Sequence, residues 1–95
     1  MTAILVRHKV QDYAKWRSCF DGLDSFHKEK GVKSAQVLRS VDNPNEVIVI
    51  TEFENVDMAH KFGQLPGLKD AMQKAGVVDQ PSIYFLDKVA TRSFA

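Results

Sequence analysis

Short runs of alternating or continuous apolar residues predict four β-strands. They span residues 3–10 (AILVRHKV), 32–41, 45–53 (NEVIVITEF) and 82–89. Each run is rich in β-branched or aromatic residues and has the length of a strand. The segment DNPN at 42–45 separates the second run from the third. Because Asp, Asn and Pro favour turn geometry, these two runs are predicted to form a hairpin.

Apolar residues that recur every three or four positions predict a long first helix. It runs from Asp12, a suitable N-cap, to about Lys30, and Gly31 is a suitable C-cap. The apolar face of this helix carries Tyr13, Trp16, Phe20, Leu23 and Phe26.

A second helical region is predicted to begin near Val56 or Asp57. The pair Pro66-Gly67 interrupts it, because proline lacks a backbone donor and glycine relaxes the chain. A further short helix is therefore expected over residues 68–75, and Gly76 ends it.

The resulting order is strand, helix, strand, strand, helix, strand, which is the split βαβ or ferredoxin-like arrangement of an α+β protein. Right-handed crossovers place both helical regions on one face of a four-stranded antiparallel sheet, with the first and third strands in its centre. The length predicts a single domain, residues 1–95.

The third predicted strand is apolar on both sides, because successive strand side chains point to opposite faces. One side carries Ile48 and Ile50, and the other carries Val47, Val49, Thr51 and Phe53. Alternation does not decide which set faces the helices. The uncovered face of the sheet also receives apolar residues from other strands, for instance Leu38, Tyr84 and Leu86. Since monomers rarely expose large apolar patches, we expect a second copy of the chain to pack sheet against sheet.

Composition narrows the classes of function. Thirteen basic and twelve acidic residues give a net charge of +1, which offers no field for nucleic acid or an anionic membrane. Cys19 is the only cysteine, so an intrachain disulfide is excluded and a small apolar helix residue in a reducing compartment is expected. No signal peptide and no stretch of about 20 apolar residues is found. We expect a cytoplasmic protein.

Three segments carry a resemblance to a known family: VRHKVQDYAKWRSCFD (6–21), SVDNPNEVIVITEFE (40–54) and MAHKFGQLPGLKDAMQKAGV (58–77). In this order they resemble the dimeric α/β-barrel superfamily, and within it the antibiotic biosynthesis monooxygenase (ABM) domains. The resemblance implies a homodimer whose two sheets enclose a barrel-like cavity for small, often aromatic, ligands. Some members of the family oxidise phenols with O₂ and no cofactor, neither metal nor flavin. Others degrade haem, cyclise polyketides or process small metabolites.

Oxygenation without a cofactor needs a pocket for a phenol, a base that helps to form the phenolate, and pocket walls that exclude water. His8 is the candidate catalytic base, because imidazole titrates near neutral pH and this residue lies toward the end of a central strand. The alternative is a polar residue at a strand end, hydrogen-bonded to water or to the backbone.

Four charged or polar residues are candidates for substrate binding. Arg39 and Tyr84 could meet His8 at one mouth of the cavity, with Arg39 holding an oxyanion or carboxylate. The alternative for Arg39 is an ion pair on the surface or at the dimer interface. Arg7 takes the side of its strand that His8 does not, so one of them points inward. Glu52 either lines the cavity as a half-buried carboxylate or reaches solvent at a sheet end.

The remaining candidates lie on the helices. Trp16 could stack on a ligand, although core packing fits its place on the apolar stripe better. His60 is expected to face solvent, with cavity lining as the alternative, and His27 is read as a surface residue that offsets the helix dipole. The three histidines show no HxxxH or HExxH spacing, so no metal site is expected.

The leading hypothesis is an enzyme of the cofactor-independent monooxygenase-like type, acting on an aromatic or polyketide-like substrate in a dimer-enclosed cavity. The alternative from another class is a non-catalytic small-molecule-binding or stress-associated module that uses the same cavity. A purely structural dimerisation domain is a third reading, and it gives His8, Arg39 and Glu52 no role.

Overall fold

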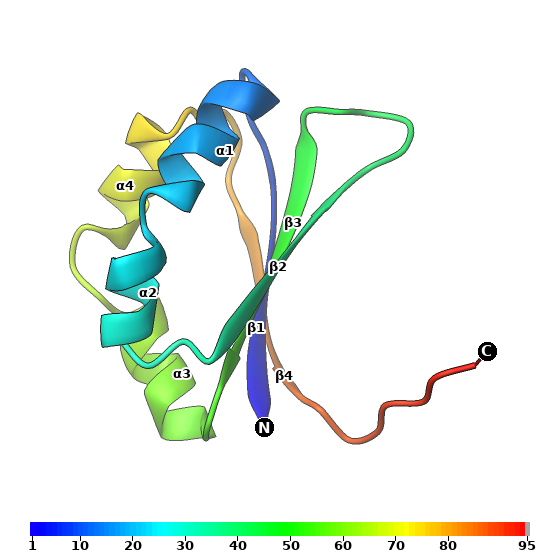
Figure 1. Ribbon diagram of the computed structural model, residues 1–95. Helices are drawn as coiled ribbons and strands as arrows, with labels where there is room; N and C mark the ends of the chain where they lie inside the picture. Colours follow the sequence, from blue (N-terminus) through cyan, green and yellow to red (C-terminus); the bar gives the residue numbers. More distant parts are fainter. Residues whose placement is uncertain (95) are drawn as a thin grey trace.

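The computed structural model describes residues 1–94, which form one sheet covered on one side by helices (Figure 1). The elements in chain order are β1 (Thr2–Lys9), α1 (Tyr13–Asp21), α2 (Asp24–Glu29), β2 (Ser34–Arg39), β3 (Glu46–Phe53), α3 (Val56–Gly63), α4 (Leu68–Lys74) and β4 (Ser82–Asp87). The strands are antiparallel in the order β2-β3-β1-β4. The predicted α+β ferredoxin-like fold, with β1 and β3 in the centre, is confirmed.

The first helical region consists of two helices, so the prediction of one helix from Asp12 to Lys30 is wrong. The Asp12 cap itself is confirmed, since its Oδ1 accepts the Lys15 N–H at 3.3 Å. α1 ends at Gly22, whose low helix propensity favours a break, and the Leu23 N–H donates to the Phe20 carbonyl at 3.0 Å in a tighter turn. α2 then starts at Asp24 in a new helical phase.

The second helical region follows the prediction closely. α3 begins at Val56, because the Asn55 side chain caps it and accepts the Met58 N–H at 3.0 Å. The predicted break at Pro66-Gly67 is confirmed, and Gly67 adopts a φ of +85° that suits glycine immediately before α4.

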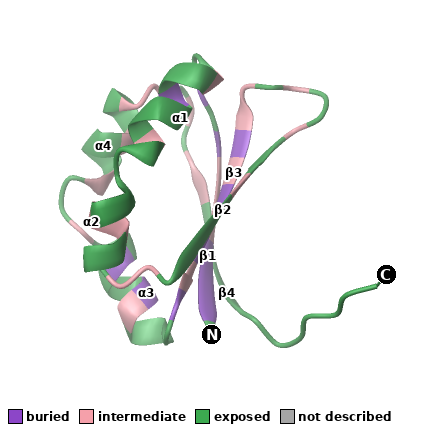
Figure 2. Cartoon of the chain, in the orientation of Figure 1, coloured by how far each residue is buried: buried purple, intermediate pink, exposed green. Residues whose placement is uncertain are grey.

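Strand register decides which residues face the helices, because directly paired residues of an antiparallel sheet share a face. In β3 the helix-facing set is Val47, Val49, Thr51 and Phe53, all buried (Figure 2). Their partners on β1 are His8, Val6, Ile4 and Thr2. The core under the helices forms two clusters, one around Ile4, Phe53, Ala59 and Phe62 and the other around Val10, Trp16, Val47 and Val49.

The opposite face of the sheet is apolar and lacks a helical cover within residues 1–94 (Figure 1). Ile48 and Ile50 lie there and are half-buried by their neighbours. Leu38, Tyr84 and Leu86 share this face and are 47%, 55% and 43% exposed. We call this surface, defined by Leu5, Leu38, Ile48, Ile50, Tyr84 and Leu86, the open face.

Candidate functional site

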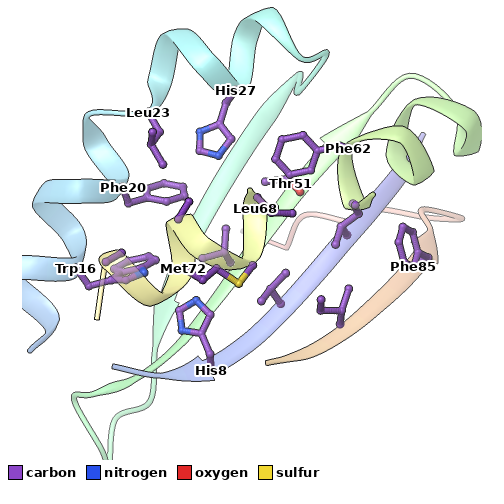
Figure 3. A pocket seen from close by; sticks show the side chains of 17 residues that line it. His8, Trp16, Phe20, Leu23, His27, Thr51, Phe62, Leu68, Met72 and Phe85 are labelled. Carbon is purple, nitrogen blue, oxygen red and sulfur yellow. The ribbon is translucent and has the colours of Figure 1, made fainter. Parts of the chain in front are cut away.

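A cavity of about 290 Å³ lies between the helix layer and the helix-facing side of the sheet (Figure 3). Its walls come from β1, β3, β4 and all four helices. Seventeen residues line it, and none of them is Asp, Glu, Lys or Arg. Apart from backbone atoms, its polar groups are the imidazoles of His8 and His27, the hydroxyl of Thr51 and the indole N–H of Trp16. The cavity therefore suits an uncharged, mainly apolar ligand.

This cavity differs in place from the predicted one. It is formed by a single chain and lies on the helix side of the sheet, whereas the expected barrel-like cavity lies between the sheets of two subunits. The enclosure between two sheets stays a prediction, because the structure contains one chain.

His8 reaches the cavity because it occupies the same face of β1 as Ile4 and Val6. Its residue exposure is 3%, and its buried Nδ1 atom has no hydrogen-bond partner in the part of the chain that the structure describes. Burial lowers the pKa of His8, and the Coulombic attraction of Asp79 opposes this in part. The lowered pKa favours the neutral imidazole at pH 7, which is the form that a general base requires.

Aromatic side chains form a continuous row along the helix side of the cavity. Trp16 on α1 meets the His8 ring edge-on at 5.6 Å between centroids and stacks on Phe20 at 5.1 Å. The row continues from Phe20 to His27 at 5.1 Å and from His27 to Phe62 at 5.9 Å. These rings exclude water and offer flat surfaces to an aromatic ligand.

His27 is the cavity residue that sequence reasoning missed. It is half-buried on α2 between Phe20 and Phe62 (Figure 3). Burial lowers its pKa, against the raising effects of Asp24 and the Leu23 carbonyl. The spacing could have revealed it, because His27 follows Phe20 by seven residues and Leu23 by four, which places it on the apolar face even of an unbroken helix. Its reading as a surface residue that offsets the helix dipole passed over this spacing.

Of the seven predicted site residues, the cavity brings together His8 and Trp16. Arg7 lies on the other side of the sheet, where its Nε donates to Glu46 Oε1 at 2.9 Å. Arg39 shares the row of Val47 and His8 on the helix side, yet its guanidinium sits 4.4 Å above the Tyr13 ring instead of entering the cavity.

The other three predicted residues also lie outside the cavity lining. Tyr84 is on the open face, so the expected cluster of His8, Arg39 and Tyr84 does not form. Glu52 shares that face, and its Oε1 is 3.6 Å from Lys88 Nζ. His60 is exposed on α3 and packs edge-on against Phe85, a lining residue, at 4.8 Å.

Two further structural features concern metal binding and membrane insertion. Within residues 1–94, no group of three or more His, Cys, Asp and Glu side chains is arranged to hold a metal ion, and Cys19 is exposed and free. None of the helices described is both long and apolar enough to cross a membrane.

Comparison with known proteins identifies the family. The family model for antibiotic biosynthesis monooxygenases matches residues 9–74, more than half of the 95-residue chain. The chain therefore belongs to the antibiotic biosynthesis monooxygenase family. A sequence search of curated proteins found no match.

Solved structures share the fold. SnoaB from Streptomyces nogalater, described as a cofactor-independent oxygenase, superposes with a TM-score of 0.76 at 18% identity, covering 95% of this chain and 94% of that one. A protein from Bordetella bronchiseptica gives 0.79 at 16% identity, covering 94% and 97%. Rv0793 from Mycobacterium tuberculosis gives 0.71 at 13% identity, covering 97% and 98%. At these identities the likeness establishes the fold alone.

The lowered pKa values of His8 and His27 predict a pH-dependent stability. Below about pH 6.5 the histidines of the unfolded chain take up protons, whereas the buried His8 and the half-buried His27 resist protonation in the folded chain. The contribution of these residues to the free energy of unfolding is therefore full above pH 6.5. It falls as the pH drops from there toward their folded-state pKa values.

Urea unfolding between pH 7.5 and pH 5 measures this slope. We expect His8→Gln to reduce it and the double variant with His27→Gln to reduce it further. A slope that is the same in wild type and in both variants would contradict the assignment of buried, neutral imidazoles.

Proposed function

We propose that the chain is a cofactor-independent oxygenase that acts on a small phenol in the cavity under the helices, with His8 as the base. The observation that carries the proposal is the buried imidazole of His8, with its lowered pKa, in the wall of a cavity without carboxylates, lysines or arginines. Family membership and the fold shared with SnoaB, a cofactor-independent oxygenase, support it.

The proposed reaction begins with a proton transfer. A phenol hydroxyl placed against His8 gives its proton to the neutral imidazole, which leaves a phenolate beside an imidazolium. No other cationic side chain lines the cavity, so the imidazolium is the counter-charge of the phenolate. In a low-dielectric cavity this pairing is stronger than it is in water.

The phenolate is then the reductant of O₂. One oxygen atom bonds to the ring carbon opposite the phenolic oxygen and becomes the second carbonyl of a quinone. The other oxygen atom leaves as water, which takes the hydrogens of the broken ring C–H and phenolic O–H bonds. The phenol supplies all four electrons that O₂ accepts, so the balance needs no external reductant. The apolar walls keep bulk water away from the intermediates.

The same proposal includes a homodimer formed through the open face. Its exposed apolar residues suit a second sheet, and the segment after β4 leaves the sheet with Val89 and Phe94 about nine-tenths exposed (Figure 1). A twin chain would cover both the face and this segment. The small-molecule site stays within each subunit, and a cytoplasmic location stays a prediction from the single cysteine.

A non-catalytic binding module is the second candidate. The observation in its favour is that Arg7, Arg39, Glu52 and Tyr84 lie outside the cavity, so no arginine stands ready to hold an oxyanion there. Such a module would bind the same aromatic ligands and leave O₂ untouched.

Oxygen uptake tests the catalytic proposal. An oxygen electrode should record one O₂ consumed per 1-naphthol, with the corresponding quinone as product. We expect His8→Gln to lower kcat/KM by about 10²–10⁴-fold, the usual contribution of a general base. His60→Gln, which alters a histidine outside the cavity lining, is the matched control and should keep the wild-type rate. Equal uptake by wild type and His8→Gln would overturn the role of His8, and saturable binding without uptake would favour the binding module.

Sedimentation tests the dimer. The wild-type protein at micromolar concentration should sediment as a particle of twice the 10.7 kDa chain mass. Leu86→Glu places a charge in the open face and should shift the protein toward monomer, whereas Lys69→Glu on α4, across the sheet from that face, should not. A folded wild-type monomer would rule out the proposed interface.

A further inference from the structure

The cavity has a second polar end that the proposed reaction at His8 does not use. His27 and Thr51 both line the cavity, and Thr51 is only 5% exposed. In Figure 3 the His27 ring lies beside Phe62 and Thr51 at one end, while His8 lies beside Trp16 and Met72 at the other. Polar side chains from two elements, α2 and β3, therefore converge at this end of an otherwise apolar wall.

The sheet register gives the separation of the two ends. His8 pairs with Val47 and Ile4 pairs with Thr51, so the two polar rows are four residues apart. At about 3.3 Å per residue, they are separated by roughly 13 Å along the strands.

Backbone bonds place His27 at the Thr51 end. The carbonyl of His27 accepts the Val32 N–H at 2.9 Å, and the next residue, Lys33, donates its N–H to the Glu52 carbonyl at 2.7 Å. The end of α2 is therefore anchored beside the row of Thr51 and away from the row of His8.

The space between the ends accepts a flat, apolar body. Phe20 and Phe62 flank His27 at ring-centroid distances of 5.1 and 5.9 Å, and Leu68 and Met72 close the cavity from α4 (Figure 3). Two hydrogen bonds of about 2.8 Å, one at each end, use less than half of the spacing of roughly 13 Å. A cavity of about 290 Å³ falls at the lower limit of the range for drug-sized ligands.

We propose that the ligand is an uncharged aromatic molecule of two fused rings with a hydrogen-bonding oxygen at each end, one oxygen on each ring. His27 and Thr51 are then the specificity-determining residues for the oxygen far from His8. The inference rests on the proposed function in that it uses the same cavity and places the reacting hydroxyl at His8. A neutral imidazole and a hydroxyl each offer a donor and an acceptor, so they can hold either a second hydroxyl or a carbonyl.

Such a site distinguishes ligands by the number of hydrogen bonds that they can make with it. A ligand with a single hydroxyl can bond to His8 and then makes no hydrogen bond to His27 or Thr51. Sites built to hydrogen-bond a ligand oxygen reject analogues that lack it. A ligand bearing a carboxylate is disfavoured as well, because the cavity lining contains no lysine or arginine.

The fluorescence of Trp16 can report ligand binding, because Trp16 is the only tryptophan of the chain and lines the cavity. Fluorescence titration without O₂ compares naphthalene-2,6-diol with 2-naphthol, which differ by one far hydroxyl. We expect the diol to bind wild type about tenfold more tightly, which corresponds to about 1.4 kcal/mol. The preference should be lost in His27→Phe, reduced in Thr51→Val, and unchanged in His60→Gln.

The outcomes separate this inference from the proposed function. A wild-type protein that binds both compounds equally overturns the two-ended ligand, as does a preference that survives in both His27→Phe and Thr51→Val. His27→Gln keeps hydrogen-bonding capacity and should retain part of the preference, so a folding defect of the phenylalanine variant does not decide the result. A tenfold preference for the diol, with no O₂ uptake in the presence of 1-naphthol, would support the two-ended ligand and contradict the oxygenase proposal. O₂ uptake with 1-naphthol and equal binding of the diol and 2-naphthol would support the oxygenase proposal and overturn the two-ended ligand.

Discussion

The antiparallel pairing of β1 with β3 is the constraint on which the rest of the structure depends. It puts His8 opposite Val47 and fixes both on the helix side of the sheet. A shift of one residue would turn His8 toward the open face and Arg7 toward the helices. Apolar burial holds the register, because Val47 and Phe53 are fully buried on the same face. The packing of the core thus determines which of two adjacent ionisable residues meets the cavity.

The location of His8 carries a cost in stability. An unpaired buried polar atom costs about 1–3 kcal/mol, and the Nδ1 of His8 is such an atom within the described residues. Because the His8 residue lines the cavity, a phenol hydroxyl placed against its ring would meet a neutral base. The apolar walls that lower the pKa of His8 would also limit the contact of a bound ligand with water.

Sequence patterns predicted the strands, the hairpin at DNPN and the break at Pro66-Gly67, because each rests on local chemistry. The break at Gly22 was missed, since the apolar spacing from Tyr13 to Phe26 continues through it and glycine is tolerated within helices. The helix-facing set of β3 was left open, because both of its sides are apolar and only the pairing decides between them.

The candidate site was predicted in part. His8 and Trp16 line the cavity, whereas Arg39 and Tyr84 were placed near His8 by their positions at strand ends. A position near a strand end does not reveal that the Arg39 guanidinium packs over the Tyr13 ring. It also does not reveal that Tyr84 lies on the opposite face of the sheet from His8. These are tertiary properties, and local spacing does not encode them. His27 follows Phe20 by seven residues and Leu23 by four, so the helical spacing indicated its inward face, but it was interpreted from its position near the helix end.

The central claim is that His8 is a neutral, buried imidazole that meets the ligand. Nitrogen-15 NMR of the histidine rings at pH 6.5, with His8→Gln to assign the signals, tests it directly. The account predicts that the His8 ring is neutral at this pH, and that its nitrogen shifts change when 2-naphthol is added without O₂. A His8 ring that is at least half protonated at pH 6.5 and does not respond to 2-naphthol would contradict the account.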